Sequence, residues 1–340
     1  MAKQKRGRRS FAFDTPPRIA AWASVAGKKE SEGPLQGYFD YTNTDTYFGE
    51  PSWEKAECRM QQLALETLLE KAGKTPKDVD MVFSGDLLNQ CISSSFALRN
   101  TGLPALGLYG ACSTMAESLL LASLTVGGGF ADRVVAMTSS HFAASERQYR
   151  YPLGYGGQRT PTAQWTVTGS GAALVSISGQ GPVITAATVG TIEDLGIADA
   201  NNMGAAMAPA AFETIRAHLD DLKAAPEDFD LIVTGDLGKV GSEILLDQFQ
   251  KSGVNLGGRH RDCGTMVFDL EGQDVHAGGS GCGCSAIVLC GYLLDGLVKK
   301  KYRRILFCGT GALLSPTSSQ QGESIPGVCH AVSISAEREG

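Results

Sequence analysis

The chain contains the same short pattern twice. Residues 76–87 and 226–237 both read Pro-x-Asp-x-Asp-x-x-x-[Ser/Thr]-Gly-Asp-Leu. A second correspondence follows in the same order, because Gly110-Ala-Cys112 and Gly281-Cys-Gly-Cys284 each open an apolar helix that leads into an apolar strand. Two matches in the same order indicate an internal duplication. The sequence therefore predicts two halves with the same order of elements.

The repeat also divides the chain into units. A length of 340 residues exceeds one ordinary domain. The segment 178–182, which reads Ser-Gly-Gln-Gly-Pro, is the expected boundary because glycine and proline mark turns. We expect a basic arm over residues 1–17, a first half over 18–180 with an insert at 141–166, and a second half over 181–340.

The pattern within each half is typical of an α/β fold. Ser52 is the expected N-cap of a helix that ends at Gly73. A buried strand follows over 79–84. Near-continuous apolar runs predict further buried, parallel strands, at 106–109, 134–138 and 172–177. The insert lacks periodicity and is rich in Arg, Tyr, Gly and Gln, which indicates a lid or a binding loop.

The composition excludes two classes of protein. With 43% hydrophobic residues and a formal net charge of −6, the chain is neither generally disordered nor a basic nucleic-acid binder. Nine cysteines, an odd number placed mostly in apolar runs, are expected to be buried and reduced. The longest apolar run, 119–126, is far shorter than the ~20 residues of a membrane span, so we expect a soluble protein. The basic arm is expected to be solvated, with contact to anionic lipid headgroups as the alternative.

Several motifs resemble those of the thiolase-like superfamily, which includes the β-ketoacyl-carrier-protein synthases. They are the strand, Gly110-Ala-Cys112 and helix, the strand Thr168-Gly-Ser-Gly-Ala-Ala-Leu-Val-Ser176, and the segment Cys308-Gly-Thr-Gly-Ala-Leu-Leu. The resemblance implies duplicated βαβαβ halves in a five-layered α-β-α-β-α architecture. It also implies a homodimer that pairs through the sheet edge of the first half, with residues 89–96 at the interface.

The closer resemblance is to a sporulation branch of this superfamily, found in spore-forming Firmicutes. Three segments carry it: 109–117, 139–142 and 148–152. The resemblance implies binding of dipicolinic acid (pyridine-2,6-dicarboxylate) or its calcium chelate, and a part in its transport into the forespore and in germination. It implies stage V sporulation A membrane proteins as partners, a peripheral place on the forespore or spore inner membrane, and no cofactor.

Cys112 is the candidate nucleophile because it lies where a strand turns into a helix. The helix dipole and free N–H groups at such a position favour a thiolate; a small buried hydrophobe is the alternative. The superfamily places His at the end of the second-half strand, where this chain has Gly235-Asp236, and Asn or His where it has Ser280. Both partners that would polarise an acyl carbonyl are therefore absent from the expected positions. We expect no catalysis; the alternative is an acyltransferase that uses Cys112.

Binding of a planar dianion needs N–H or cationic donors beside an apolar slot. Glycine-rich loops bring backbone amides close to a ligand, His141 follows a strand end, and Arg147, Arg150 and Arg159 lie on the insert. The expected ligand-binding residues are Cys112, His141, Arg147, Gly279, Ser280, Thr310 and Gly311.

Other signals are weaker. Cys282 and Cys284, with Cys263 and His276, lack a second pair at zinc spacing, so no metal site is expected. Local turn or capping bonds are expected for the repeated aspartates, Asp86 and Asp236, rather than acid–base roles. The glycines at 127–129 are expected to end a helix.

Overall fold

The computed structural model describes residues 4–149 and 158–337, and it contains two halves with the same strand order. The first half orders its strands β6-β5-β7-β9-β3, and the second orders its strands β12-β11-β14-β15-β10. Numbered along the chain within each half, both orders are third, second, fourth, fifth and first, so the predicted duplication is confirmed. The strands are β3 (Arg18–Ala26), β5 (Met81–Gly85), β6 (Ala105–Leu108), β7 (Arg133–Ser140), β9 (Gly169–Ser176), β10 (Val183–Thr188), β11 (Leu231–Thr234), β12 (His260–Asp262), β14 (Arg304–Ala312) and β15 (Gly327–Ser335).

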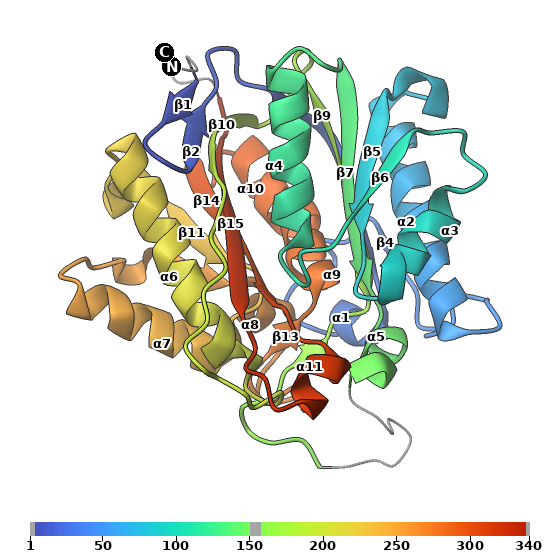
Figure 1. Cartoon of the computed structure of the whole chain (residues 1–340). Helices are drawn as coiled ribbons and strands as arrows, with labels where there is room; N and C mark the ends of the chain where they lie inside the picture. The colour runs from blue at the N-terminus through green and yellow to red at the C-terminus, as the bar shows by residue number, and fades with distance from the viewer. Residues whose placement is uncertain (1–3, 150–157, 338–340) are drawn as a thin grey trace.

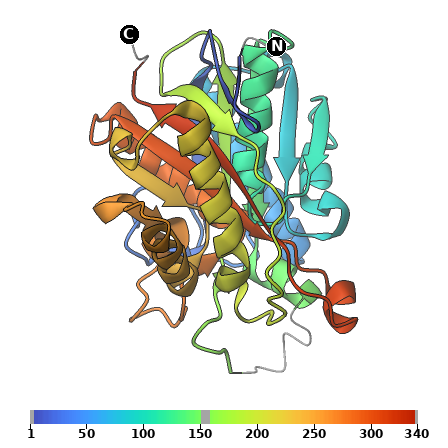
Figure 2. The same cartoon turned by 60° about the vertical axis from the view of Figure 1, so that its left-hand side comes forward.

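The two halves of the sheet join where β10 pairs with β3, and the helices form three layers around them (Figure 1). Helices α2 (Trp53–Ala72) and α3 (Ile92–Leu98) cover the outer face of the first half. Helices α4 (Thr114–Gly127), α9 (Cys282–Val288) and α10 (Leu294–Val298) lie between the sheets. Helices α6 (Met203–Leu222) and α7 (Gly238–Lys251) cover the second half, and Figure 2 shows α6 lying across its strands. The five-layered α-β-α-β-α architecture is thus confirmed, with a separate hydrophobic cluster at each helix layer.

Strand direction differs from the prediction at one place. The residues predicted as a parallel strand at 172–177 belong to β9, which pairs antiparallel with both β3 and β7. All eight β9 residues are buried because helices cover both faces of this half of the sheet. A strand buried on both faces is apolar throughout whichever way it runs, so the pattern could not reveal its direction.

The outer helix α2 shows why the local predictions succeed. The Ser52 hydroxyl accepts a hydrogen bond from the Lys55 N–H, and Gly73 ends the helix with a left-handed φ of 60°. Apolar residues at a spacing of four, beginning at Ala56 and Met60, turn one face toward the sheet and are fully buried. Helix α4 likewise ends at Gly127, as predicted.

The insert is more ordered than predicted. Its first part forms helix α5 (Phe142–Tyr149), and its last part forms β8 (Trp165–Thr166), which pairs with β13 (Gly279–Ser280). The Nδ1 atom of His141 accepts from the Ala144 N–H at 3.3 Å, so an unusual capping residue begins α5. Residues 150–157, including Arg150, lie outside the described residues.

The basic segment at the N-terminus is folded onto the second half and is not a free arm. Strands β1 (Lys5–Arg6) and β2 (Ser10–Ala12) form a hairpin, and β2 pairs with β10. The Asp221 carboxylate accepts from the Arg9 N–H and from the Ser10 hydroxyl. Other short elements are α1 (Lys28–Ser31), β4 (Tyr41–Thr42), α8 (Cys263–Val267) and α11 (Pro316–Gln320).

Within the described ranges, every helix is too short or too polar to cross a bilayer. All nine cysteines are free thiols, and eight of them are buried.

Candidate functional site

Cys112 lies in a narrow cleft at the turn between β6 and α4. The residue before it, Ala111, has a φ of 49°, a left-handed conformation that is strained for a residue with a side chain. The cleft has a volume of about 30 Å³, which is room for about one water molecule. The residues that line it are Leu87, Tyr109, Ala111, Cys112, Tyr149, Met203, Ser280, Ala312 and Leu314.

Three of the residues predicted to bind a ligand do meet Cys112 or its turn. The Sγ atom of Cys112 lies 4.0 Å from the Ser280 hydroxyl. Gly311 packs so closely on the turn that an added Cβ would lie 3.2 Å from the Cys112 nitrogen. The Thr310 hydroxyl joins the same cluster because it and Ser280 both bond to Asp236.

Asp236 is the central polar residue that the sequence interpretation missed. Its Oδ1 accepts from the Thr310 hydroxyl at 2.7 Å, and its Oδ2 accepts from the Gly281 N–H at 3.0 Å and the Ser280 hydroxyl at 3.3 Å. The expectation that it bonds within its own turn is wrong. Complete burial raises the pKa of Asp236 to about 6, although these hydrogen bonds, with one from Cys112, lower it. The repeated Gly-Asp-Leu motif is the sequence feature that could have identified Asp236 as a site residue.

The environment of Cys112 opposes a thiolate. Burial, followed by the negative charge of Asp236, raises the pKa of the Cys112 thiol well above its usual range. The prediction that the helix dipole would favour a thiolate is therefore wrong, because the loss of solvent and the adjacent carboxyl oppose it. The cleft holds a neutral thiol beside a carboxyl of pKa about 6.

Gly279 lies behind the cleft rather than in it. Its carbonyl oxygen accepts from the Gln164 Nε2 at 2.9 Å, and the same amide nitrogen donates to the Asp236 carbonyl at 2.7 Å. An added Cβ at Gly279 would meet the side chains of Val167 and Cys284. Gly279 and Gln164 therefore hold the cleft wall in place.

His141 and Arg147 lie outside the Cys112 cleft. His141 donates from Nε2 to the Thr46 carbonyl at 2.8 Å, and its Nδ1 caps α5. Arg147 forms an ion pair with Glu54, and its guanidinium lies 5.5 Å from the centre of the Trp53 ring. Neither side chain is among the residues that line the Cys112 cleft.

A third arginine is half-buried in a wall of the insert. Arg159 makes two hydrogen bonds to the Glu146 carboxylate, at 3.1 and 3.0 Å, and one to the Gln164 carbonyl at 2.8 Å. Its guanidinium also lies 4.5 Å from the centre of the Trp165 ring. Arg159 therefore fixes the insert against β8.

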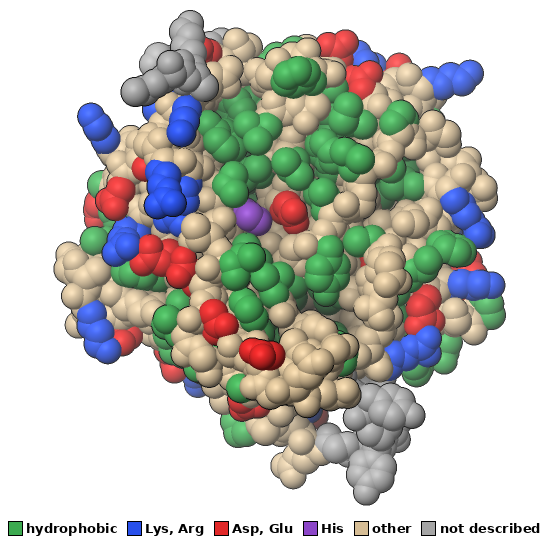
Figure 3. Space-filling model, viewed as in Figure 1, with side chains coloured by type: hydrophobic (Ala, Val, Ile, Leu, Met, Phe, Trp, Pro, Cys, Tyr) green, Lys and Arg blue, Asp and Glu red, His purple; other side chains and the backbone are tan. Residues whose placement is uncertain are grey.

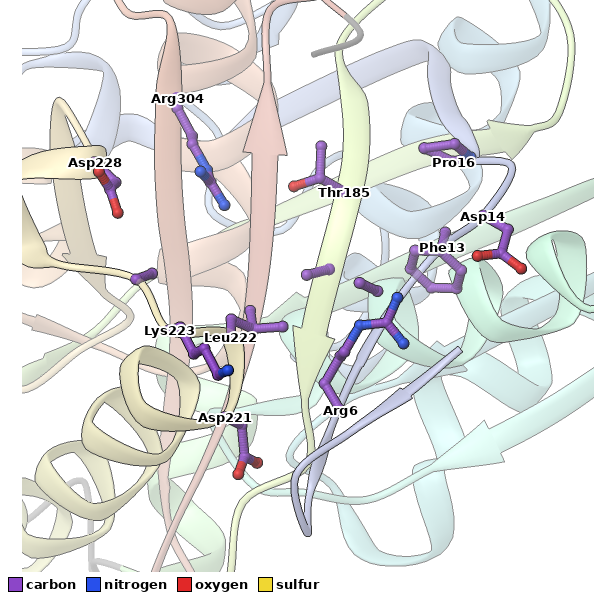
Figure 4. Close-up of a pocket in the computed structure, with 13 residues that line it drawn as sticks. Arg6, Phe13, Asp14, Pro16, Thr185, Asp221, Leu222, Lys223, Asp228 and Arg304 are labelled. Carbon is purple, nitrogen blue, oxygen red and sulfur yellow. The ribbon is translucent and has the colours of Figure 1, made fainter. Parts of the chain in front are cut away.

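A larger cavity, of about 690 Å³, lies between the N-terminal hairpin and the end of α6 (Figure 4). Arg6, Lys223 and Arg304 share its lining with three aspartates, including Asp221, whose carboxylate already binds backbone N–H groups of the hairpin. Equal numbers of basic and acidic side chains give this cavity no preference for an anion.

The fold and the position of the cleft define a class of protein. The structure is similar to that of Xanthomonas campestris OleA with cerulenin bound, with a TM-score of 0.61 and 14% identity, over 95% of this chain and 97% of that chain. It is also similar to 3-oxoacyl-(acyl-carrier-protein) synthase III from Aquifex aeolicus VF5, with a TM-score of 0.56 and 13% identity, over 94% and 99% of the two chains. Identities this low show the fold alone, and the fold is thiolase-like.

The sequence itself gives the particular family. The model of stage V sporulation protein AD (SpoVAD) matches residues 7–335. Stage V sporulation protein AD of Bacillus subtilis (strain 168) is 45% identical over 326 residues, which cover 96% of each chain. The chain belongs to the stage V sporulation protein AD family, which is named for sporulation and not for an enzyme activity.

Proposed function

We propose that the chain binds dipicolinic acid, free or as its calcium chelate, and thereby supports dipicolinate uptake into the forespore and its later use in germination, without catalysing acyl transfer. The observation that supports this most is the neutral Cys112 thiol beside the buried Asp236 carboxyl. A condensing enzyme needs a thiolate nucleophile and donors for the developing oxyanion. A binding protein needs only the donors.

In the cleft, we propose that the ligand contacts side-chain hydroxyl groups and backbone atoms of the Cys112 turn. Ser280 and Thr310 present hydroxyl groups, and Gly311 lets the backbone approach the Cys112 turn. The cleft of about 30 Å³ does not hold a pyridine ring, so binding there requires the side chains at its mouth to move. The exposed ring of Tyr109 is one of these side chains.

The alternative function is acyl transfer through Cys112. The solved structures with the same fold include condensing enzymes, and the thiol occupies the start of a central helix as a nucleophile would. Among the described residues that line the cleft, none is His, Asn or Lys. Intact mass after incubation with acyl-CoA decides between the two functions, because an adduct that disappears in Cys112→Ala would establish the enzyme.

Calorimetric titration with dipicolinate, with and without calcium, tests binding directly. We expect saturable heat, and we expect Ser280→Ala to weaken binding by about fivefold, the value of one hydrogen bond. Ser285→Ala, at a buried serine further along α9 whose hydroxyl donates to the Cys282 carbonyl, is the matched control and should leave affinity unchanged. A folded protein that gives no saturable heat at millimolar ligand would overturn the proposal.

We also propose a homodimer. Strand β6 lies at the end of the sheet order, and residues 89–96 lie beside it. Large apolar side chains are exposed at this edge, among them Ile92, Phe96 and Leu106. Figure 3 shows hydrophobic side chains gathered in the middle of this face and basic ones mainly toward its edges. Light scattering that gives the mass of a monomer would contradict this proposal.

Transport would then depend on partners. We propose that the dimer lies peripherally on the forespore or spore inner membrane and delivers dipicolinate to stage V sporulation A membrane proteins. Its basic N-terminal hairpin, with Lys5 and Arg6, offers a surface for acidic headgroups or acidic partners.

A further inference from the structure

The loop of residues 86–91, which connects β5 to α3, has an unusual backbone conformation (Figure 1). Two consecutive residues, Gln90 and Cys91, have φ angles of 57° and 52°, in the left-handed region. A Cβ is disfavoured there, and neither side chain is one of the short polar ones, Asn or Asp, that adopt this region more readily. Such strain persists only where surrounding contacts impose it. The 86–91 loop is therefore held in a conformation that it would leave if those contacts were broken.

The start of the loop is fixed to the fold. The Asp86 carboxylate accepts from the Leu88 N–H at 2.9 Å and from the Ser94 N–H at 2.8 Å, which ties this end of the loop to α3. Leu88 is completely buried. Leu87, between these two fixed residues, lines the Cys112 cleft. The first half of the loop therefore acts as a hinge, and the left-handed residues beyond it are the part that can move.

One hydrogen bond of the left-handed part holds the segment that carries Tyr109. The buried Cys91 thiol donates to the Leu108 carbonyl at 3.1 Å. Leu108 is the last residue of β6, and the exposed ring of the next residue, Tyr109, lines the Cys112 cleft. The backbone at the cleft mouth is thus bonded to a residue whose own conformation is strained.

A second hydrogen bond of the loop reaches helix α5. The Asn89 N–H donates to the Gln148 Oε1 at 3.1 Å. The next residue of α5, Tyr149, lines the cleft, and its hydroxyl bonds to the Thr166 hydroxyl at 2.7 Å. One short loop therefore joins the two segments of the chain that place tyrosines in the lining of the cleft.

We propose that the 86–91 loop is a strained latch that holds the Cys112 cleft closed. When its two left-handed residues relax, the bonds to β6 and α5 break, and the segments that carry Tyr109 and Tyr149 are free to move apart. The strain that is released offsets part of the cost of the broken bonds, so a ligand that binds the open cleft can shift the population toward it.

The latch supplies the movement that the proposed function needs. The closed cleft of about 30 Å³ has room for about one water molecule. The inference rests on the proposed function for the identity of the ligand, because dipicolinate is the ligand proposed to enter. Opening itself is a property of the chain without any ligand, so it can be measured separately.

The accessibility of the Cys112 thiol measures opening. Iodoacetamide is larger than the space in the closed cleft, so it alkylates Cys112 only in the open state. The full chain is treated with iodoacetamide, and mass spectrometry of the peptide that contains Cys112 gives the rate. Gln90 is the residue to change, because its side chain is exposed and is not among the described residues that line the cleft.

Two substitutions of Gln90 should change this rate in opposite directions. We expect Gln90→Gly to slow alkylation of Cys112 by about fivefold, because glycine adopts the left-handed region without steric cost and stabilises the closed latch. Gln90→Val should speed alkylation, because a β-branched side chain fits this region poorly. The same rate in the wild type and in both variants would overturn the latch.

Lys223→Gly is the matched control. Lys223 follows α6 with a φ of 54°, so glycine relieves the same kind of strain there, but this residue lines the cavity beside the N-terminal hairpin instead of the Cys112 cleft. We expect both glycine variants to resist urea better than the wild type, and only Gln90→Gly to slow alkylation. Equal slowing in Lys223→Gly would show that the thiol reacts through global unfolding, which would overturn the latch.

Light scattering is measured on the same variants, because Gln90 lies in the segment proposed for the dimer interface. We expect the same mass for all of them. Alkylation rates that change only where the mass changes would assign the effect to the interface and overturn the latch.

Calorimetric titration with dipicolinate separates the latch from the proposed function. Affinity that falls in Gln90→Gly in step with the alkylation rate would support both. Alkylation that responds to Gln90 as expected, without saturable heat from dipicolinate, would retain the latch and overturn the proposed function. Saturable heat, with alkylation that does not respond to Gln90, would retain the proposed function and overturn the latch.

Discussion

The two halves share a strand order and a Gly-Asp-Leu turn, but their aspartates bond in different directions. Asp86 closes its own turn by accepting from the Leu88 N–H at 2.9 Å and from the N–H and hydroxyl of Ser94. This is the local role that the sequence predicts for it. Asp236, at the equivalent position of the second half, reaches away from its turn to Thr310 and into the Cys112 cleft.

Another residue supplies the turn bonds in the second half. Asp262, at the end of β12, accepts from the N–H groups of Leu237 and Gly238 at 2.8 and 2.9 Å. Because Asp262 accepts these turn hydrogen bonds, the Asp236 carboxyl can bond to residues of the cleft instead. After a duplication, one copy of a residue that stabilises a turn can thus become part of a binding site.

The largest expected effect is on stability, because we expect substitution of Asp86 to destabilise the fold far more than substitution of Asp236. In Asp86→Asn only one side-chain oxygen remains, so the N–H of either Leu88 or Ser94 would face an NH₂ group. We expect a loss of roughly 3–5 kcal/mol in the free energy of unfolding, from a buried unpaired donor and broken bonds. Urea unfolding of the full chain measures it.

The matched variant is Asp236→Asn. Its oxygen can still accept from the Gly281 N–H, and its NH₂ can donate to the Thr310 hydroxyl, which can reverse its role. We expect a change of less than about 1 kcal/mol at neutral pH, because removal of a buried charge offsets the weakened hydrogen bonds. Equal losses in the two variants would refute the division of roles.

A second effect concerns pH. The folded-state pKa of Asp236, about 6, lies above its ordinary value of 3.8, so ionisation costs more in the folded chain than in the unfolded one. The stabilising contribution of the protonated group is complete below about pH 4 and is lost as pH rises through about 6. The loss is at most ~3 kcal/mol. Stability measured against pH should fall less steeply over this window in Asp236→Asn, and superimposable curves would contradict the raised pKa.

The smallest expected effect compares the equivalent helices α2 and α6. Ser52 caps α2 through its side chain, whereas the Asn202 side chain makes no capping bond at α6. Ser52→Ala should cost about 1 kcal/mol, and Asn202→Ala should change stability by less than about 0.5 kcal/mol. Thermal unfolding of both variants measures the difference, and a larger loss from Asn202→Ala would show that the caps are not as described.

The sequence predicted the frame well because the repeat and most apolar runs reflect burial directly. The run at 106–109, predicted to be a buried strand, is the exception, because β6 is exposed at the end of the sheet. Cys112, Ser280 and Thr310 were expected together and do meet, since they lie at strand ends or helix starts on one edge of the sheets. His141 was misplaced because its position depends on a helix that begins at its own ring. Asp236 was misassigned because an Asp beside Gly satisfies local and distant donors equally well, and only the fold decides between them.

The pairing of β2 with β10 also affects how the chain is made. The Ser10 hydroxyl bonds to Thr188, 178 positions later, and to Asp221, 211 positions later. Ser10 therefore cannot reach its final contacts until Thr188 and Asp221 have been synthesised. The first half can form most of its sheet during that interval, since domains fold as units during translation. Strand β2 of the N-terminal hairpin, however, cannot pair with β10 until the second half has been synthesised.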